Sequence, residues 1–174
     1  MKLSTRGRYG TRLMVDLAQH YADGPIPLVE IAKRQDLSAK YLEQLIILLK
    51  GAGLIRSVRG RRGGYVLARK PGKISVGEIV ETLEGKLSLV DCVLDPELCY
   101  RADGCPTRDI WVSMTDVIKK ELFSLSLGDI LAKSTTVDEL LQSNDCEGGR
   151  YGKARTHLAD YHYQRERPHQ EGSY

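Results

Sequence analysis

The first half of the chain carries apolar side chains at the spacing of short amphipathic helices. Three such runs predict helices over 5–22, from Pro27 to the turn at 35–37, and over 39–52. A proline suits the first turn of the second helix, and Ser38 is a candidate N-cap for the third. The positions that we expect to be buried are Leu13, Met14, Leu17, Ala18, Tyr21, Leu28, Ile31, Ala32, Leu42, Leu45, Ile46 and Leu49.

A basic hairpin is predicted after these three helices. Two short β-prone runs, 54–58 and 65–67, flank a tip at 59–64 that consists of arginine and glycine. Three helices followed by such a hairpin is the element order of a winged helix-turn-helix domain. We therefore expect a mainly α fold with a small β-hairpin wing, over residues 1–85.

The second half predicts a connecting loop and a long helix. Ser75 and Glu78 form a capping box for a fourth helix that ends at Gly85. We expect a loop over 86–106, and a helical region over 107–143 in which 107–125 is one long helix and 127–132 and 137–141 are short ones. The apolar stripe of the long helix is broader than a small monomer needs, which predicts a homodimer formed through it. Aliphatic residues nearly vanish from 144 to 174, which is typical of a disordered tail.

Composition and charge narrow the function. The 174 residues are 41% apolar and 28% charged, as in ordinary soluble proteins, and no stretch could span a membrane or serve as a signal peptide. We expect a cytoplasmic protein. The net charge is only +3, but residues 1–12 and 56–73 carry arginines and lysines and no acid. These stretches favour a polyanionic partner.

The predicted partner is double-stranded DNA. The third helix would enter the major groove with its N-terminal outward residues, while the hairpin tip and the start of the first helix would lie on phosphates. Arg12 would join that phosphate clamp. The candidate DNA-contacting residues are Arg6, Arg8, Ser38, Lys40, Tyr41, Glu43, Gln44, Arg59, Gly60, Arg61 and Arg62.

Three cysteines lie close together in the predicted loop. Cys92, Cys99 and Cys105 include no CxxC pair, which disfavours structural zinc, whereas three thiolates in a loop with glycine and proline suit an iron–sulfur cluster. The fourth ligand stays open between a nearby carboxylate, the partner subunit and a small thiol. Buried unreactive thiols, a thiol–disulfide switch and a zinc site remain alternatives. We expect Cys146 to be a bystander.

An enzymatic function is not predicted. No cysteine has a histidine close to it in sequence, and the chain has no glycine-rich phosphate loop or paired catalytic carboxylates.

Several stretches resemble the Rrf2 family of transcription regulators, and within it the iron–sulfur regulators of the IscR type. The resemblance covers about residues 1–142. The matching residues are Arg8-Tyr9-Gly10-Thr11-Arg12, Pro27-Leu28-Val29-Glu30-Ile31-Ala32, Tyr41-Leu42-Glu43-Gln44-Leu45, Gly53-Leu54-Ile55, residues 57–60 and 63–65, and the three cysteines followed by Thr107-Arg108-Asp109-Ile110-Trp111.

The resemblance implies a homodimer on a palindromic operator, a [2Fe–2S] cluster on Cys92, Cys99 and Cys105, and control of iron–sulfur assembly genes. Related members respond to nitric oxide or control cysteine metabolism, so a regulator without a cluster, controlled by thiol redox, nitric oxide or a partner protein, is the alternative. One position departs from the resemblance. IscR-type regulators have a histidine ligand where this chain has Arg108, and arginine stays protonated and cannot bind iron.

Overall fold

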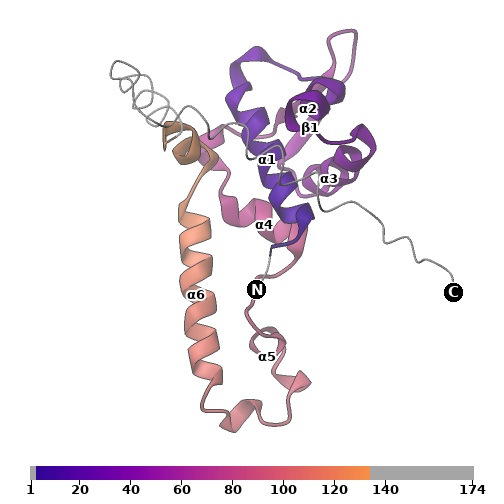
Figure 1. Ribbon diagram of the computed structural model, residues 1–174. Coiled ribbons are helices and arrows are strands. Elements are labelled where there is room, and N and C mark those ends of the chain that lie inside the picture. The colour runs from indigo at the N-terminus through magenta and orange to yellow at the C-terminus, as the bar shows by residue number, and fades with distance from the viewer. Residues whose placement is uncertain (1–2, 134–174) are drawn as a thin grey trace, which may run out of the picture. The chain divides into compact units, whose positions relative to one another are not determined.

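The computed structural model describes residues 3–133, and Figure 1 shows the path of the chain. The described part is mainly helical with one two-stranded antiparallel sheet. Its longer elements are α1 (Thr5–Gln19), α2 (Leu28–Gln35), α3 (Ala39–Gly51), β1 (Ile55–Val58), β2 (Gly64–Leu67), α4 (Val76–Glu84), α5 (Asp91–Leu94) and α6 (Arg108–Ser124). Within residues 3–133, no helix is both long and apolar enough to cross a membrane.

The hydrophobic core lies between α1, α2, α3 and α4, as the periodicity predicts. Every α3 position that we expected to face inward is buried, and Leu13 and Ile31 are fully buried on α1 and α2. Ser38 caps α3 by accepting a hydrogen bond from the backbone N–H of Tyr41. The first helix is shorter than predicted: α1 ends at Gln19, and Tyr21–Asp23 form a separate 3₁₀ turn. Tyr21 therefore leaves the helical face on which we expected it to be buried, and it is 46% exposed.

The hairpin is tied to the start of the helix-turn-helix. Ile55 pairs with Leu67 and Val58 with Gly64, and the strand β2 also bonds Ile26 through two backbone hydrogen bonds with Tyr65, of 2.9 and 3.0 Å. A Cβ on Gly64 would collide with the backbone of Ile26, so this third strand-like contact requires glycine. The hairpin is therefore held at a fixed place beside α2.

Helix α4 connects the first three helices and the hairpin to α6, since it packs against α1, α3 and α6. Gly10 lets α1 approach Leu83, and Gly77 lets the ring of Phe123 approach α4. Two backbone hydrogen bonds, from Val76 to Leu125 and from Leu127 to Ile74, fasten the end of α6 to the start of α4. A displacement of α6 would thus also displace the start of α4.

The segment between α4 and α6 differs from the predicted irregular loop. It contains α5 and two 3₁₀ turns, Pro96–Leu98 and Ala102–Gly104. Each of these elements has three or four residues, which is too few for a helical period to show in the sequence. The predicted long helix is confirmed as α6, and residues 127–133 are helical behind the capping pair Ser126 and Asp129. The predicted helix over 137–141, the tail 144–174 and Cys146 lie outside the described residues.

Candidate nucleic-acid interface and cysteine segment

The outer face of α3 carries the side chains that we predicted for base reading. Helix α3 buries one face in the core, and Lys40, Glu43 and Gln44 are exposed on the opposite face. Ser38 is exposed as well, at the N-terminal end of the helix. This arrangement leaves one polar face of α3 free to enter a groove.

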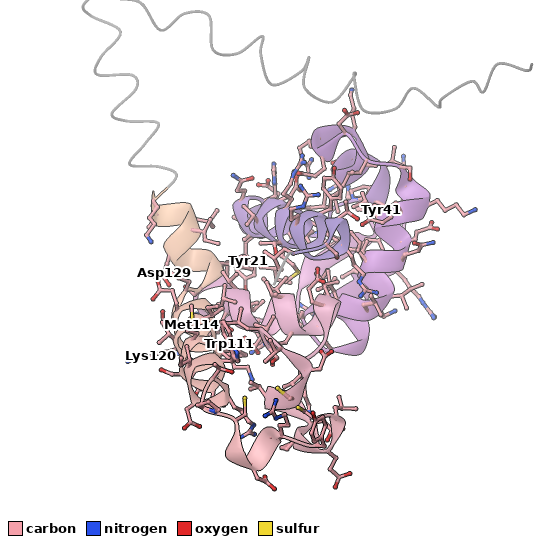
Figure 2. All side chains as sticks on the ribbon, turned by 60° about the horizontal axis from the view of Figure 1, so that its bottom comes forward. Tyr21, Tyr41, Trp111, Met114, Lys120 and Asp129 are labelled. Carbon is pink, nitrogen blue, oxygen red and sulfur yellow. The ribbon has the colours of Figure 1, made fainter. Side chains whose placement is uncertain are left out.

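Tyr41 does not lie on that outer face, and the prediction that it faces away from the core is wrong. Its ring packs edge-on against Tyr9 of α1 with 6.1 Å between ring centroids, and it rests against the hydrophobic core. Its hydroxyl is buried and has no hydrogen-bond partner within residues 3–133. Tyr41 is labelled in Figure 2. The side chain therefore holds α3 against α1, at the flank of the outward face.

Helix α1 presents all three predicted phosphate-binding arginines at the surface, and two of them, Arg6 and Arg8, lie in its first turns. Arg6 and Arg8 are exposed, and Ser4 caps the helix by accepting from the backbone N–H groups of Arg6 and Gly7. Glu84 reaches over from α4 and accepts from Ser4 and Gly7, at 2.6 and 2.9 Å. The first turn of α1 is thereby fixed to the end of α4.

Arg12, the third arginine of the predicted phosphate clamp, is exposed as well, but its guanidinium already has partners within the protein. Its guanidinium donates to the side chain and to the backbone carbonyl of Gln35, at 3.1 and 3.0 Å. It also lies over the ring of Tyr9, 5.5 Å from the centroid. Arg12 therefore connects α1 to the end of α2.

The hairpin tip is an exposed basic surface. Arg59, Arg61 and Arg62 are all exposed, and no carboxylate forms an ion pair with them within residues 3–133. The tip turns at Gly60, whose φ of 124° is a backbone conformation that side-chain-bearing residues rarely adopt. The backbone N–H of Gly63 donates to the Gly60 carbonyl at 2.9 Å and closes the turn. The three guanidinium groups are free for phosphates.

A buried ionic network, which the sequence analysis missed, joins α1 to α2. Asp16 is 2% exposed and accepts two hydrogen bonds from Arg34, at 2.7 and 3.0 Å, and one from Gln35 at 2.8 Å. Burial alone would raise the pKa of Asp16, but the hydrogen bonds from Arg34 and Gln35 outweigh it and hold the pKa below its ordinary value. The signal in the sequence was a carboxylate between Leu13 and Leu17 on the apolar face of the first helix.

The three cysteines lie on the segment between α4 and α6. All are free and half-buried: Cys92 is in α5, and Cys99 and Cys105 each follow a 3₁₀ turn. The Sγ of Cys105 lies 3.3 Å from the Thr107 hydroxyl, and this hydrogen bond is the main cause that lowers the pKa of the thiol. A lowered pKa favours the thiolate, which is the form that binds metals.

The donor set suits iron, but its atoms are not gathered. Three thiolates are the ligand type of iron–sulfur clusters. Within residues 3–133, however, no three His, Cys, Asp or Glu side chains come close enough together to hold a metal ion. Arg108, at the position expected of a fourth ligand, donates from Nε to the carbonyl of Cys92 at 3.2 Å. It therefore shapes the segment and supplies no ligand.

Comparison with known proteins decides the family. Residues 3–133 match the family model named Rrf2, which is described as an iron-dependent transcriptional regulator. The chain belongs to the Rrf2 family. The resemblance seen in the sequence is thus confirmed, and this Rrf2 protein is a DNA-binding transcription regulator and not an enzyme.

Relatives of two kinds resemble this Rrf2 protein. The regulator CymR of Bacillus subtilis is 42% identical over 130 residues, 75% of this chain and 89% of that protein. The regulator IscR of Xenorhabdus nematophila is 37% identical over 138 residues, 79% of this chain and 84% of that protein. Relatives of both names match at similar identity, and so membership of the family alone does not decide which signal this protein responds to.

The solved structures that match this protein also include both CymR and IscR. The structure of CymR, named the global cysteine regulator of B. subtilis, matches with a TM-score of 0.65 and 40% identity over 76% of this chain and 98% of that one. The structure of T. potens IscR matches with a TM-score of 0.64 and 43% identity over 77% of this chain and 88% of that one. These likenesses confirm the winged-helix fold that the element order predicts.

Proposed function

We propose that this Rrf2 protein is a dimeric regulator whose DNA affinity depends on an iron–sulfur cluster held by Cys92, Cys99 and Cys105. It would bind a palindromic operator in the cytoplasm through the outer face of α3, the exposed arginines of the hairpin tip, and Arg6 and Arg8. Genes of iron–sulfur assembly are the targets that the sequence resemblance implies.

The observation that carries this proposal is where the three thiols lie. The segment that bears them begins directly after α4 at Gly85 and ends directly before α6 at Arg108. Helix α4 packs on both α1 and α3, and its Glu84 fixes the first turn of α1. Bringing three separated sulfurs to one cluster changes the course of this segment, and α4 is the element that would pass the change to the DNA-binding face.

When bound, the cluster would supply a redox-active and oxygen-sensitive group. The chain's own residues provide its ligands and its connection to DNA. The hydrogen bond with Thr107 lowers the pKa of Cys105, which makes its thiolate easier to form, and Arg108 holds the backbone of Cys92 from the start of α6. The remaining ligand is to be sought outside this set, because arginine has no free lone pair to offer.

The visible absorption spectrum of the full chain purified without oxygen tests the cluster. We expect thiolate-to-iron absorption bands in the wild type and in Cys146→Ala, which is the matched control because it also removes one cysteine. Cys99→Ala is expected to be colourless but folded. A colourless wild type that cannot be reconstituted, or a Cys99→Ala variant with the full spectrum, would overturn the proposal.

A second candidate is a regulator that responds to thiol oxidation without a cluster. It is favoured by the relatives named CymR, one of which has been solved in an oxidized form. A disulfide also needs only two of the three sulfurs to meet, whereas a cluster needs all three. In that case the protein is colourless, and its operator affinity changes on disulfide reduction.

Dimerisation through α6 rests on the apolar side chains that this helix leaves uncovered. Its stripe divides: Ile118, Leu122 and Leu125 are half-buried, whereas Met114 and Val117 are 49% and 65% exposed. Ile110 and Trp111 extend the uncovered part, and Figure 2 labels Trp111 and Met114 on α6. A contiguous apolar surface of this kind on a long helix is typical of a protein–protein interface. A second copy of α6 would bury it.

A double substitution on this stripe is expected to abolish the dimer. Met114→Glu with Val117→Glu would bring four carboxylates into a two-fold interface, so the protein should sediment as a monomer at concentrations where the wild type is a dimer. Lys120→Glu is the control, because it adds a carboxylate on the same helix outside the apolar stripe. An unchanged sedimentation coefficient for the double variant would rule out this interface.

A further inference from the structure

The outer face of α3 contains a large apolar side chain among its polar ones. Ile47 is 68% exposed. It follows Lys40 by seven residues, Glu43 by four and Gln44 by three, and these spacings place all four on one face of a helix. The core-facing residues Leu42 and Leu49 lie on the opposite side. Ile47 therefore extends the surface that we assign to DNA toward the C-terminal end of α3.

We propose that Ile47 is a specificity-determining residue that contacts the 5-methyl group of a thymine in the major groove. This inference rests on the proposed DNA-binding role of α3. In the major groove the thymine methyl is the apolar group that separates A·T pairs from the others, and apolar side chains are its partners. An isoleucine there has no hydrogen bond to offer, so its contribution to sequence choice comes from this contact.

The position of Ile47 along the helix also fits. At about 1.5 Å per residue, Ile47 lies roughly 10 Å beyond Lys40 along the axis of α3. The N-terminal residues of a recognition helix meet base edges first. Ile47 would then face a base pair about three steps farther along the same groove, since base pairs are spaced about 3.4 Å apart. Glu43 and Gln44 stand on either side of it and would line the polar edges of the same stretch.

A single exposed apolar residue can also be a chance feature of a surface. Val29 on α2 is the comparison that the chain provides, because it is 73% exposed and apolar but does not lie on α3. If exposure alone explained Ile47, the two side chains would behave alike toward DNA. The proposal requires that only Ile47 is sensitive to a methyl group on a base.

Uracil substitution in the operator tests this directly, because uracil differs from thymine only by the missing methyl. The operator is first selected from random duplexes with the full-length wild-type protein, and each thymine is then replaced in turn. We expect one thymine in each half-site at which uracil weakens wild-type binding about fourfold, the effect of losing one buried methyl contact. Ile47→Ala should bind the thymine and uracil operators equally.

Val29→Ala is the control variant for Ile47→Ala. Val29→Ala should keep the wild-type response to uracil. Both variants are expected to fold, since the two side chains are exposed and alanine favours helix. Equal binding of all uracil operators by the wild type, or an undiminished uracil effect in Ile47→Ala, would overturn the role of Ile47 while leaving DNA binding intact. Failure to select any operator would overturn the proposed function together with it.

Discussion

Replacing Arg59, Arg61 and Arg62 together by alanine is expected to lower operator affinity roughly 10⁴- to 10⁶-fold at about 0.1 M salt, because the proposed dimer places two hairpins, and so six of these arginines, on one operator. Each lost phosphate contact removes about one released counterion, and at this salt concentration each is worth somewhat less than a factor of ten. The slope of log affinity against log salt should become shallower by about 5, since six phosphate contacts are lost per operator. Titration of the operator by fluorescence anisotropy at several salt concentrations measures both quantities.

The control for the hairpin variant removes the same charge elsewhere. Lys119, Lys120 and Lys133 lie on α6 and on the helical residues after it, and their replacement by alanine should leave the salt slope unchanged. If this triple variant lost affinity and salt dependence as strongly as the hairpin variant, the protein's overall charge would explain binding, and the hairpin would have no special role.

Asp16→Ala is expected to lower the free energy of unfolding by about 3 kcal/mol. The substitution leaves Arg34 and Gln35 without the buried acceptor that joins α2 to α1, and removal of one partner of such a pair costs about this much. Arg34 remains partly exposed to water, which limits the loss. Urea denaturation measures it, and Glu30→Ala is the control because its contact with Arg34 is longer and exposed.

The same pair predicts how stability depends on pH. Because the pKa of Asp16 is lowered in the folded protein, its contribution is complete above the unfolded-chain pKa of about 3.9 and is lost as pH falls through the folded pKa. The wild type should be more stable than Asp16→Asn at neutral pH. The difference should disappear as pH falls through the folded pKa of Asp16. A difference that persists unchanged into strong acid would mean that the charge of Asp16 is not what stabilises the pair.

Local rules were enough to predict most of the fold. Ser38 caps α3, and Ser75 and Glu78 form the expected capping box, because each pattern acts within four residues. The core positions of α3 followed from helical periodicity in the same way. The exposure of Lys40, Glu43 and Gln44 was predictable because the same periodicity places them on the face of α3 opposite the core.

Contacts between elements distant in sequence could not be predicted. Tyr41 sits at the edge of the polar face of α3, and only the ring of Tyr9 on another helix turns it toward the core. Arg12 has the sequence context of a phosphate ligand, but Gln35 on α2 binds it. Glu84 caps a helix that begins eighty residues earlier, and no local rule finds such a cap.

In the cysteine segment, too, the residues could be predicted from the sequence but their contacts could not. The sequence identified the three thiols, and the structure confirms that all three are free on one connection between α4 and α6. Within residues 3–133 the three sulfurs do not come together as one metal site. No spacing rule predicted that Arg108 would donate to the carbonyl of Cys92.

The most direct measurement is the operator dissociation constant of cluster-loaded protein, compared with that of the same preparation after the iron is removed. A coupling of the usual size predicts a difference of about tenfold or more in the wild type. Cys99→Ala should give the iron-free value under both conditions. Equal dissociation constants for cluster-loaded and iron-free wild type would contradict the proposal that a cluster controls the DNA affinity of this Rrf2 protein.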